Sequence, residues 1–372
     1  MAKKELNVVE ILNKEIEKLE TKKNKVYFYV VDSKASPVGL LSYEYDIALQ
    51  LKKLGYNVAM LHNEKDFVGV ADWLGKEYAE LKHYQIEKDN VLMAPSDILI
   101  IPEVCAGVMA QTKNLSCRRI ALLHSLAFLT DSVTLGTGWA DLRINECIVS
   151  TPLLEKKIKE YFPFVKTHVI RPSIPDFFFE KPKAPKQLVI NVIVKDTTDI
   201  NRILKPFYWK YPAYAWVAFR PINRNLTREA FADALKESFA TIWVDDFTDF
   251  GYSAIEALAC KNVIVGKVPE NAPEWIVDEN GKLSDTGLWF YNSYDAADAI
   301  ASVIQSFISN NIPQEVFAEG EKVVKNYTTE LQKIDIQEEF EKKIIPNKIS
   351  ELRLAISVQQ QEEENNKKKD NE

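Results

Sequence analysis

Cysteine and histidine are scarce in this 372-residue chain, and neither forms a pattern that holds a metal. The four cysteines contain no Cys-x-x-Cys pair, and most stand in apolar stretches (Cys105, Cys117, Cys147 and Cys260). The four histidines contain no His-Glu-x-x-His motif and no pair at helical spacing. The sequence therefore predicts reduced core thiols, and it excludes a disulfide framework and zinc sites of these types.

Long apolar runs and an excess of positive charge are also missing. No window approaches about 18 consecutive apolar residues, and the start of the chain, Met-Ala-Lys-Lys-Glu, is polar. We therefore expect neither a membrane span nor a secretory signal, and we predict a cytoplasmic protein. The formal net charge of −7 argues against a protein whose main role is to hold nucleic acid, although it leaves room for a local basic groove.

Two successive sets of short apolar strands, alternating with amphipathic helices, fill most of the chain. The first set is predicted at residues 25–178 and the second at 188–312, with a proline-rich linker at 179–187. Strands that are apolar without interruption, such as 26–31 and 188–194, are typical of parallel sheets that helices cover on both faces. The sequence therefore predicts an α/β fold of two Rossmann-like, doubly wound domains that face a central cleft, where ligands of such folds bind.

Helices are predicted outside the two domains as well. Residues 1–24 contain an amphipathic helix, which either caps the fold or forms a homodimer. Residues 313–358 look helical throughout, and we expect them to cross back and brace both domains. The tail at 359–372 is polar with blocks of like charge, so we predict that it is disordered.

The most informative segment is 249–260, in which a glycine turn precedes a short helix. Gly251 lets a ligand approach the backbone closely. Ser253 stands among the first free N–H groups of the helix, which attract anions. Glu256 lies about one turn further, where a carboxylate accepts hydrogen bonds from the vicinal hydroxyls of a sugar. Phosphate at the helix tip and ribose on Glu256 would form a sugar-nucleotide site; the alternative is an ordinary α/β loop with a surface glutamate.

Residues 25–310 resemble the GT-B glycosyltransferases, in particular the large family-4-like group (glycosyl transferases group 1). The resemblance is carried by the loop and helix from Gly39 to Val58, the strand 120–123 that ends in His124, the strands 147–150 and 169–172, and the segment 248–265. The last is the most specific, because it is similar to the E-x7-E region of the family. The resemblance implies the GT-B architecture and the transfer of a sugar from a nucleotide-sugar donor, such as a UDP- or GDP-sugar, with no cofactor.

The resemblance also implies roles for residues on the donor side. Glu256 would hold the nucleotide ribose, and His124 would contact the donor sugar or its phosphate. The residues expected at the donor phosphates are Lys195, Arg202, Gly251, Tyr252 and Ser253. The chain has no Asp-x-Asp triplet. This fits metal-independent chemistry, in which helix N-termini and cations hold the diphosphate.

Two departures from the family pattern affect the donor side. The first glutamate of the E-x7-E region would stand where this chain has Thr248, with Asp249 beside it as the nearest carboxylate. The G-R…K-G arrangement of the family is reduced to Lys195, a point charge without the fork of arginine. These departures leave a non-catalytic nucleotide-sugar-binding or scaffold protein as an alternative.

The acceptor is expected on the N-terminal domain, in the loop 32–42 around Gly39 and in the loop 125–145 with Trp139. Three carboxylates are candidates for a catalytic base: Asp32, Glu103 and Asp131. The resemblance implies a retaining enzyme, which does not require such a base. The acceptor itself stays open among a glycan, a lipid-linked molecule, a protein and modified DNA.

The sequence also contains two basic clusters, and two further enzyme classes are compatible with the predicted fold. The clusters, which have aromatic neighbours, are Arg118-Arg119 and the group Arg220, Arg224 and Arg228. They fit contacts with a phosphate-rich acceptor, contacts with donor phosphates, or solvated helix ends. A nucleotide-sugar epimerase and a transferase that acts on modified DNA bases remain open as functions of the same architecture.

Overall fold

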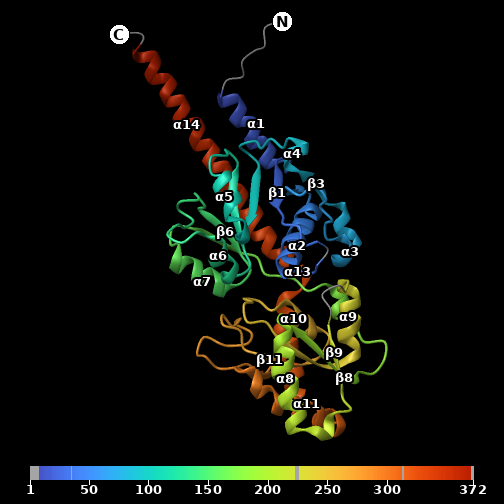
Figure 1. Cartoon of the computed structure of the whole chain (residues 1–372). Coiled ribbons are helices and arrows are strands. Elements are labelled where there is room, and N and C mark those ends of the chain that lie inside the picture. The colour runs from blue at the N-terminus through green and yellow to red at the C-terminus, as the bar shows by residue number, and fades with distance from the viewer. Residues whose placement is uncertain (1–7, 35, 223–225, 312–313, 370–372) are drawn as a thin grey trace.

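Two parallel β-sheets, one above the other in Figure 1, organise the chain. The computed structural model describes residues 8–369 except 35, 223–225 and 312–313. All strand pairs of both sheets run parallel, as the uninterrupted apolar strands predict. The prediction of two doubly wound α/β domains is therefore confirmed.

The N-terminal domain is built on a seven-stranded sheet with the order β3-β2-β1-β4-β5-β6-β7. Its strands are β1 (Lys25–Tyr29), β2 (Asn57–His62), β3 (Lys82–Gln85), β4 (Ile98–Pro102), β5 (Arg118–Leu123), β6 (Glu146–Val149) and β7 (Lys166–Val169). The chain runs outward from β1 to β3 and then returns to the other side of β1, so the order reverses between β1 and β4. Ligands of such sheets bind beyond the carboxyl ends of the strands at this reversal.

The C-terminal domain has a five-stranded sheet with the order β12-β11-β10-β8-β9, which reverses between β8 and β10. Its strands are β8 (Gln187–Val194), β9 (Ala218–Pro221), β10 (Ser238–Val244), β11 (Val263–Lys267) and β12 (Gly287–Phe290). The strands β3 and β12 were not evident in the sequence, because each is an edge strand of four residues, too short to show a pattern.

Helices cover both faces of both sheets. They are α2 (Gly39–Lys53), α3 (Ala71–Leu74), α4 (Ile86–Asp89), α5 (Ala106–Gln111), α6 (Leu126–Ser132) and α7 (Pro152–Tyr161) in the first domain, and α8 (Thr197–Lys210), α9 (Arg228–Glu237), α10 (Tyr252–Ala259) and α11 (Ala296–Ile308) in the second. The strand β1 shows why its sequence is apolar without interruption. Val26 and Phe28 belong to the core on one face of the sheet, and Tyr27 and Tyr29 to the core on the other.

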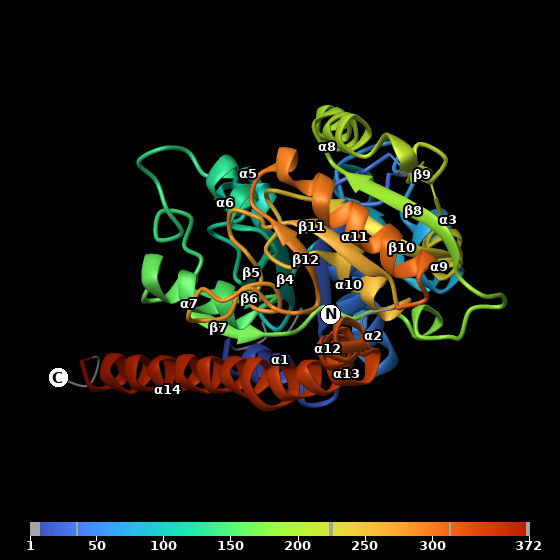
Figure 2. The ribbon, with the colours of Figure 1, turned by 90° about the horizontal axis from the view of Figure 1, so that it is seen from below.

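The C-terminal helices cross from the second domain back to the first. Helix α12 (Gln314–Val324) packs against α10, and α13 (Thr329–Ile336) packs against α2. A π-helical segment, Gln337–Ile344, then leads into α14 (Ile345–Lys369). Helix α14 lies beside the N-terminal helix α1 (Val8–Glu20) along the first domain (Figure 2). These helices thus contact both domains, as the sequence predicts for 313–358.

The predicted disorder of the tail differs from the structure. Helix α14 continues through Lys369, so 359–369 is helical, and 370–372 lie outside the described residues. The tail contains only Gln, Glu, Asn and Lys up to that point, without Gly or Pro. Gln, Glu and Lys are good helix formers, and a helix that has already begun extends at little cost through such residues.

Candidate active site

A pocket of about 540 Å³ lies between the two domains, beyond the carboxyl ends of their strands. It is lined by Pro37, Val38, Gly39, Leu40, Ser42, Trp73, His124 and Phe128 of the first domain, and by Ile193, Val194, Lys195, Ile222, Leu226, Arg228, Phe231, Trp243, Val244, Asp245, Phe247, Thr248, Tyr252, Ser253 and Glu256 of the second. His124 directly follows β5, Lys195 follows β8 and Asp245 follows β10. The pocket therefore lies at the reversal of the second sheet, where the topology predicts a ligand site.

The glycine turn precedes α10, whose first residues Tyr252 and Ser253 line this pocket, whereas Gly251 is not a lining residue. Gly251 has the left-handed backbone angles φ 81° and ψ 53°. A Cβ atom there would stand 3.1 Å from Trp243 and 3.2 Å from Trp275, so only glycine fits without strain. Thr248 Oγ1 accepts a hydrogen bond from the Gly251 N–H at 2.8 Å and another from Phe250 N–H at 3.3 Å. The threonine that replaces the first glutamate of the family pattern thus stabilises the turn itself.

Asp249, the carboxylate next to Thr248, forms a hydrogen bond between the two domains. Its side chain is buried, and its Oδ2 accepts a hydrogen bond from Leu126 N–H, at the start of α6, at 2.8 Å. Its Oδ1 accepts one from Asn271 Nδ2. Ser125 Oγ donates to the main-chain oxygen of Phe247 at 3.2 Å. Asp249 is not among the lining residues of the pocket, so it joins the two domains rather than facing a ligand.

Glu256 lines the pocket and is paired with an arginine that sequence reasoning did not single out. Arg228 Nε lies 3.3 Å from Glu256 Oε1, and Arg228 Nη1 lies 3.5 Å from Asp46 on α2 of the other domain. All three side chains are buried. Burial raises the pKa of Glu256 to about 7, although Arg228 lowers it in part. The sequence showed Arg228 only as part of a basic cluster, because a partner 182 residues away leaves no local pattern.

His124, Gly39 and Tyr252 meet where the two domains face each other. A Cβ atom on Gly39 would lie 3.2 Å from the Tyr252 ring and 3.4 Å from His124 Nε2. The His124 and Tyr252 rings are 5.7 Å apart. Burial lowers the pKa of His124 to about 3, and the positive charge of Lys195 lowers it further. His124 is therefore uncharged at neutral pH, and its buried Nδ1 has no hydrogen-bond partner among the described residues.

Glu103, a candidate base, lies beneath His124 and does not line the pocket. Its Oε1 accepts hydrogen bonds from the main-chain N–H groups of His124 at 3.0 Å and Ser125 at 2.8 Å. Burial raises its pKa to about 8, although these hydrogen bonds lower it in part. Glu103 therefore positions the turn that carries His124.

The expected phosphate-binding cations are placed differently from each other. Lys195 lines the pocket and pairs with Asp245 at 2.8 Å, with half of its side chain exposed. Ser253 also lines the pocket, and its Oγ accepts a hydrogen bond from Trp243 Nε1 at 3.1 Å. Arg202 is not a lining residue; it pairs with Asp199 on its own helix at 3.4 Å.

The acceptor loop has one lining residue that the sequence did not suggest. Trp139 is fully buried in the core of the first domain and stacks on Phe162 with ring centres 5.0 Å apart, so it does not face a ligand. Asp131 is exposed on α6 and does not line the pocket, and neither does Asp32, which accepts a hydrogen bond from Lys34 N–H. Phe128 lines the pocket instead.

The four cysteines are buried and unpaired, as predicted. Within the described ranges, no group of three or more His, Cys, Asp or Glu residues is arranged to hold a metal ion. A helix long and apolar enough to cross a membrane is likewise not found in the described part of the chain.

Solved structures of glycosyltransferases share this arrangement of domains. Among them are a glycosyltransferase from Rickettsia africae ESF-5 (14% identity, 86% of this chain and 99% of that chain covered, TM-score 0.58) and the pneumococcal O-GlcNAc transferase GtfA in complex with UDP and GlcNAc (10%, 86% and 99%, TM-score 0.58). A third is the sucrose-phosphate synthase of Thermosynechococcus elongatus (15%, 86% and 98%, TM-score 0.58). The chain has the GT-B fold.

The GT-B architecture expected from the sequence is thus confirmed. Neither a protein-family model nor a curated protein matches the chain. At identities of 10–15% the shared fold does not carry over the activity of these enzymes. Gly39, His124 and Glu256, which carried the resemblance in three separate segments, all line one pocket of this GT-B protein.

Proposed function

We propose that this GT-B protein is a glycosyltransferase that takes a sugar from a nucleotide-sugar donor, such as a UDP- or GDP-sugar, and passes it to an acceptor on the N-terminal domain. One observation carries the proposal. A single pocket joins a cation after β8 (Lys195), the N-terminal end of α10, a buried carboxylate one turn into that helix (Glu256) and a neutral histidine from the other domain (His124). A related fold, GtfA, was solved with UDP and GlcNAc.

The parts of a nucleotide sugar have matching groups in this pocket. The diphosphate meets Lys195 and the first N–H groups of α10, which carry partial positive charge. The ribose hydroxyls donate to Glu256 when it is ionised. Trp243, Phe231 and Ile193 supply apolar lining around these polar groups. Such a pocket, mostly apolar with a few converging polar groups, is typical of small-molecule sites.

Transfer with retention and without a metal is part of the proposal. The charge that develops on the leaving diphosphate is met by Lys195, the N-terminal end of α10 and, behind Glu256, Arg228. The described lining residues of the N-terminal domain include no carboxylate, so no Asp or Glu base faces the acceptor side. This supports the retaining outcome, in which the departing donor can receive the acceptor proton.

Calorimetric titration with UDP, GDP and ADP and their sugars tests the proposal. We expect one nucleotide series to bind, and Glu256→Ala to weaken that binding about tenfold or more, since a charged hydrogen bond to ribose is lost. Glu321→Ala, which removes an exposed glutamate paired with Lys261, is the matched control and should bind as the wild type does. Failure of every nucleotide to bind would remove the proposal. Conversion of the sugar nucleotide to an isomer without an acceptor would indicate an epimerase instead.

A non-catalytic nucleotide-sugar-binding protein is the second candidate. It is favoured by Thr248 and Asp249, which serve the turn and the domain contact rather than a donor sugar. Release of nucleotide from the sugar nucleotide that binds, measured with and without a panel of acceptors, separates the two. Binding with no release under any condition supports the second candidate, whereas acceptor-dependent release supports a transferase.

A further inference from the structure

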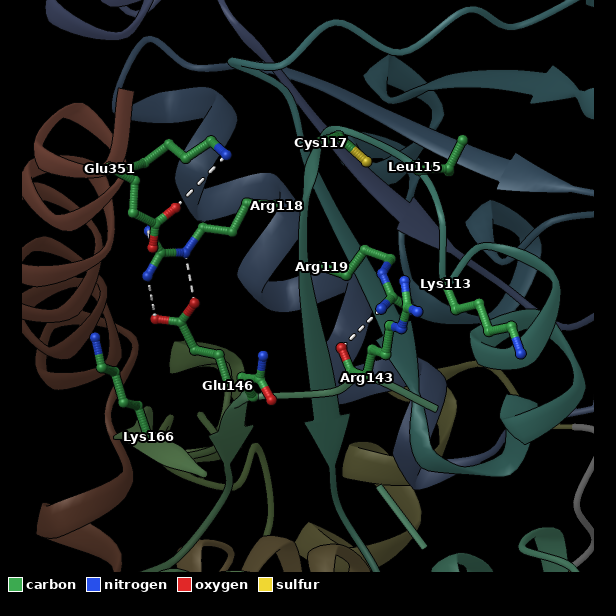
Figure 3. Close-up of a pocket in the computed structure, with 11 residues that line it drawn as sticks. Lys113, Leu115, Cys117, Arg118, Arg119, Arg143, Glu146, Lys166 and Glu351 are labelled. Carbon is green, nitrogen blue, oxygen red and sulfur yellow. Dashed lines mark hydrogen bonds and ion pairs between the residues drawn. The ribbon is translucent and has the colours of Figure 1, made fainter. Parts of the chain in front are cut away.

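A second pocket, of about 310 Å³, lies at the other end of the N-terminal sheet from the interdomain pocket (Figure 3). The strands β5, β6 and β7 begin there, with Arg118, Glu146 and Lys166 as their first residues. Helix α14 forms one side with Lys348 and Glu351. This basic pocket therefore uses the amino ends of the strands, whereas the candidate active site uses carboxyl ends.

The basic pocket concentrates positive charge in an acidic protein. Six cationic side chains and two carboxylates line it: Lys113, Arg118, Arg119, Arg143, Lys166 and Lys348 with Glu146 and Glu351. The whole chain has a formal net charge of −7. Cations gathered in this way repel one another, and a bound anion would relieve that repulsion.

Two of the arginines have only uncharged acceptors. Arg119 donates to the main-chain oxygens of Met109, Leu142 and Arg143 at 2.7 to 3.1 Å. Arg143 donates to Asn114 Oδ1 at 3.1 Å. Across the described residues, neither arginine has a carboxylate within ion-pair distance. The two arginines are neighbours, because Arg119 Nη2 donates to the Arg143 main-chain oxygen at 2.7 Å. Burial lowers the pKa of Arg119, and the charge of Arg143 lowers it further.

Arg118 adds a buried donor that has no acceptor. Its side chain is 6% exposed, and its Nη2 donates to Glu146 Oε1 at 2.6 Å. Its Nη1 has no hydrogen-bond partner, and Glu351 Oε1 lies 3.5 Å away. Arg118 and Arg119 are consecutive residues of β5, so their side chains lie on opposite faces of the sheet, and Arg118 Nη1 is directed at Glu351 of α14 (Figure 3).

We propose that the basic pocket binds a phosphate-bearing anion of more than one negative charge, at a site separate from sugar transfer. Arg143 would hold its oxygens with the N–H groups that do not donate to Asn114, and the charge of Arg119 would add to the attraction. The exposed Lys113 and Lys166 add charge at the rim. The pocket shares no residue with the candidate active site, so this proposal stands or falls independently of the proposed function.

Because Lys348 and Glu351 line the pocket, a bound anion would also hold α14 against the first domain. This predicts that the ligand protects α14 from hydrogen exchange. The effect would be seen at residues remote from the interdomain pocket, and it would be absent with ligands of that pocket alone.

Titration of the full chain with inorganic pyrophosphate at low salt, by calorimetry and thermal shift, tests the proposal. We expect wild-type protein to bind, and Arg119→Gln with Arg143→Gln to weaken binding about tenfold or more. A matched control, Lys82→Gln with Lys88→Gln, removes the same charge from exposed positions at the other edge of the sheet. This control should bind within about twofold of the wild type.

A second experiment with vesicles that contain phosphatidic acid, whose headgroup is a phosphate monoester, identifies the source of the phosphate. Vesicle binding that depends on the same two arginines assigns a lipid headgroup, whereas binding of pyrophosphate alone assigns a free anion; either supports the site. Binding of neither probe overturns it. A pyrophosphate response lost in Lys195→Gln and kept in the arginine variant overturns it too. If the arginine variant is misfolded by circular dichroism, Lys113→Gln with Lys166→Gln, both exposed, replaces it with the same expected loss.

Discussion

Arginine side chains have different partners in the two pockets of this protein. In the interdomain pocket, Arg228 lies between Glu256 and Asp46, and the three side chains are buried together. In the basic pocket, Arg119 and Arg143 meet only main-chain and amide oxygens. In the first pocket the cation is paired with two carboxylates of the protein, so its energy depends on keeping these side chains together. The basic pocket has unpaired positive charge, which a bound anion or salt must neutralise. The comparison shows that the pairing of charges, more than their number, decides what each pocket can bind.

Removing each arginine gives the largest expected difference. Arg228→Met leaves two buried carboxylates without their cation, so the free energy of unfolding should fall by about 3–5 kcal/mol. Arg119→Met loses hydrogen bonds to neutral oxygens and relieves repulsion, so its loss should be about 1–2 kcal/mol. Urea denaturation measures both. Equal losses of unfolding free energy would contradict the difference between the two pockets, because they would mean that Arg228 is no more tightly paired than Arg119.

The glycine turn before α10 is expected to be the next most sensitive feature. Gly251→Ala places a Cβ 3.1 Å from Trp243 in a left-handed backbone, so it should destabilise the fold by about 2–4 kcal/mol. Gly55→Ala is a matched control with φ 90° and no atom within 4 Å, and should cost about 1 kcal/mol. Thermal and urea unfolding of both variants measure the difference. Similar costs would show that the indole rings yield, and that the turn before α10 is not rigid.

The pH dependence of donor binding tests whether Glu256 of the interdomain pocket contacts the donor. The group is protonated below its raised pKa of about 7 and then cannot accept both ribose hydrogen bonds. The affinity for the UDP- or GDP-sugar that binds should therefore rise about tenfold from about pH 6 to about pH 8. Calorimetry at both pH values checks this. Glu256→Gln should bind weakly with a flat profile, and a variant that keeps the wild-type pH dependence would exclude Glu256 as its origin.

The smallest expected effect is at Thr248. Thr248→Val removes the hydroxyl that accepts the Gly251 N–H, so the free energy of unfolding should fall by about 1 kcal/mol. Thr248→Ser keeps the hydroxyl and should restore most of that loss. Urea unfolding of the two variants distinguishes the hydroxyl from the methyl group. If serine is no better than valine, packing rather than the hydrogen bond explains this position.

Local patterns were sufficient for most of the architecture. The helix α7 begins at Pro152 after the capping residue Thr151, whose side chain accepts a hydrogen bond from Leu154 N–H, and these are signals that adjacent residues carry. The left-handed Gly251 at the start of α10 is local in the same way. The predicted disorder of 359–369 was wrong, because composition describes an isolated segment and not one that continues a packed helix.

The candidate site was visible from the sequence only in part. His124 and Lys195 could be found because each directly follows a strand, and Glu256 because it lies one turn into a helix that follows a glycine turn; the topology brings such ends to one edge. The aromatic Trp139 and the carboxylate Asp249 were ambiguous. Whether such side chains face a cleft or a core depends on the neighbours that the fold supplies.

The sequence by itself determined two parallel sheets, a glycine turn before α10 and the residue types at the strand ends, since backbone geometry and apolar periodicity act over a few residues. Only the tertiary structure decided which charges pair. Arg228 and Asp46 are separated by 182 positions, and Arg118 meets Glu351 of α14 through a contact that no local pattern encodes. Electrostatic energy depends on distance in space and on burial, and both are set when the domains and the crossing helices pack.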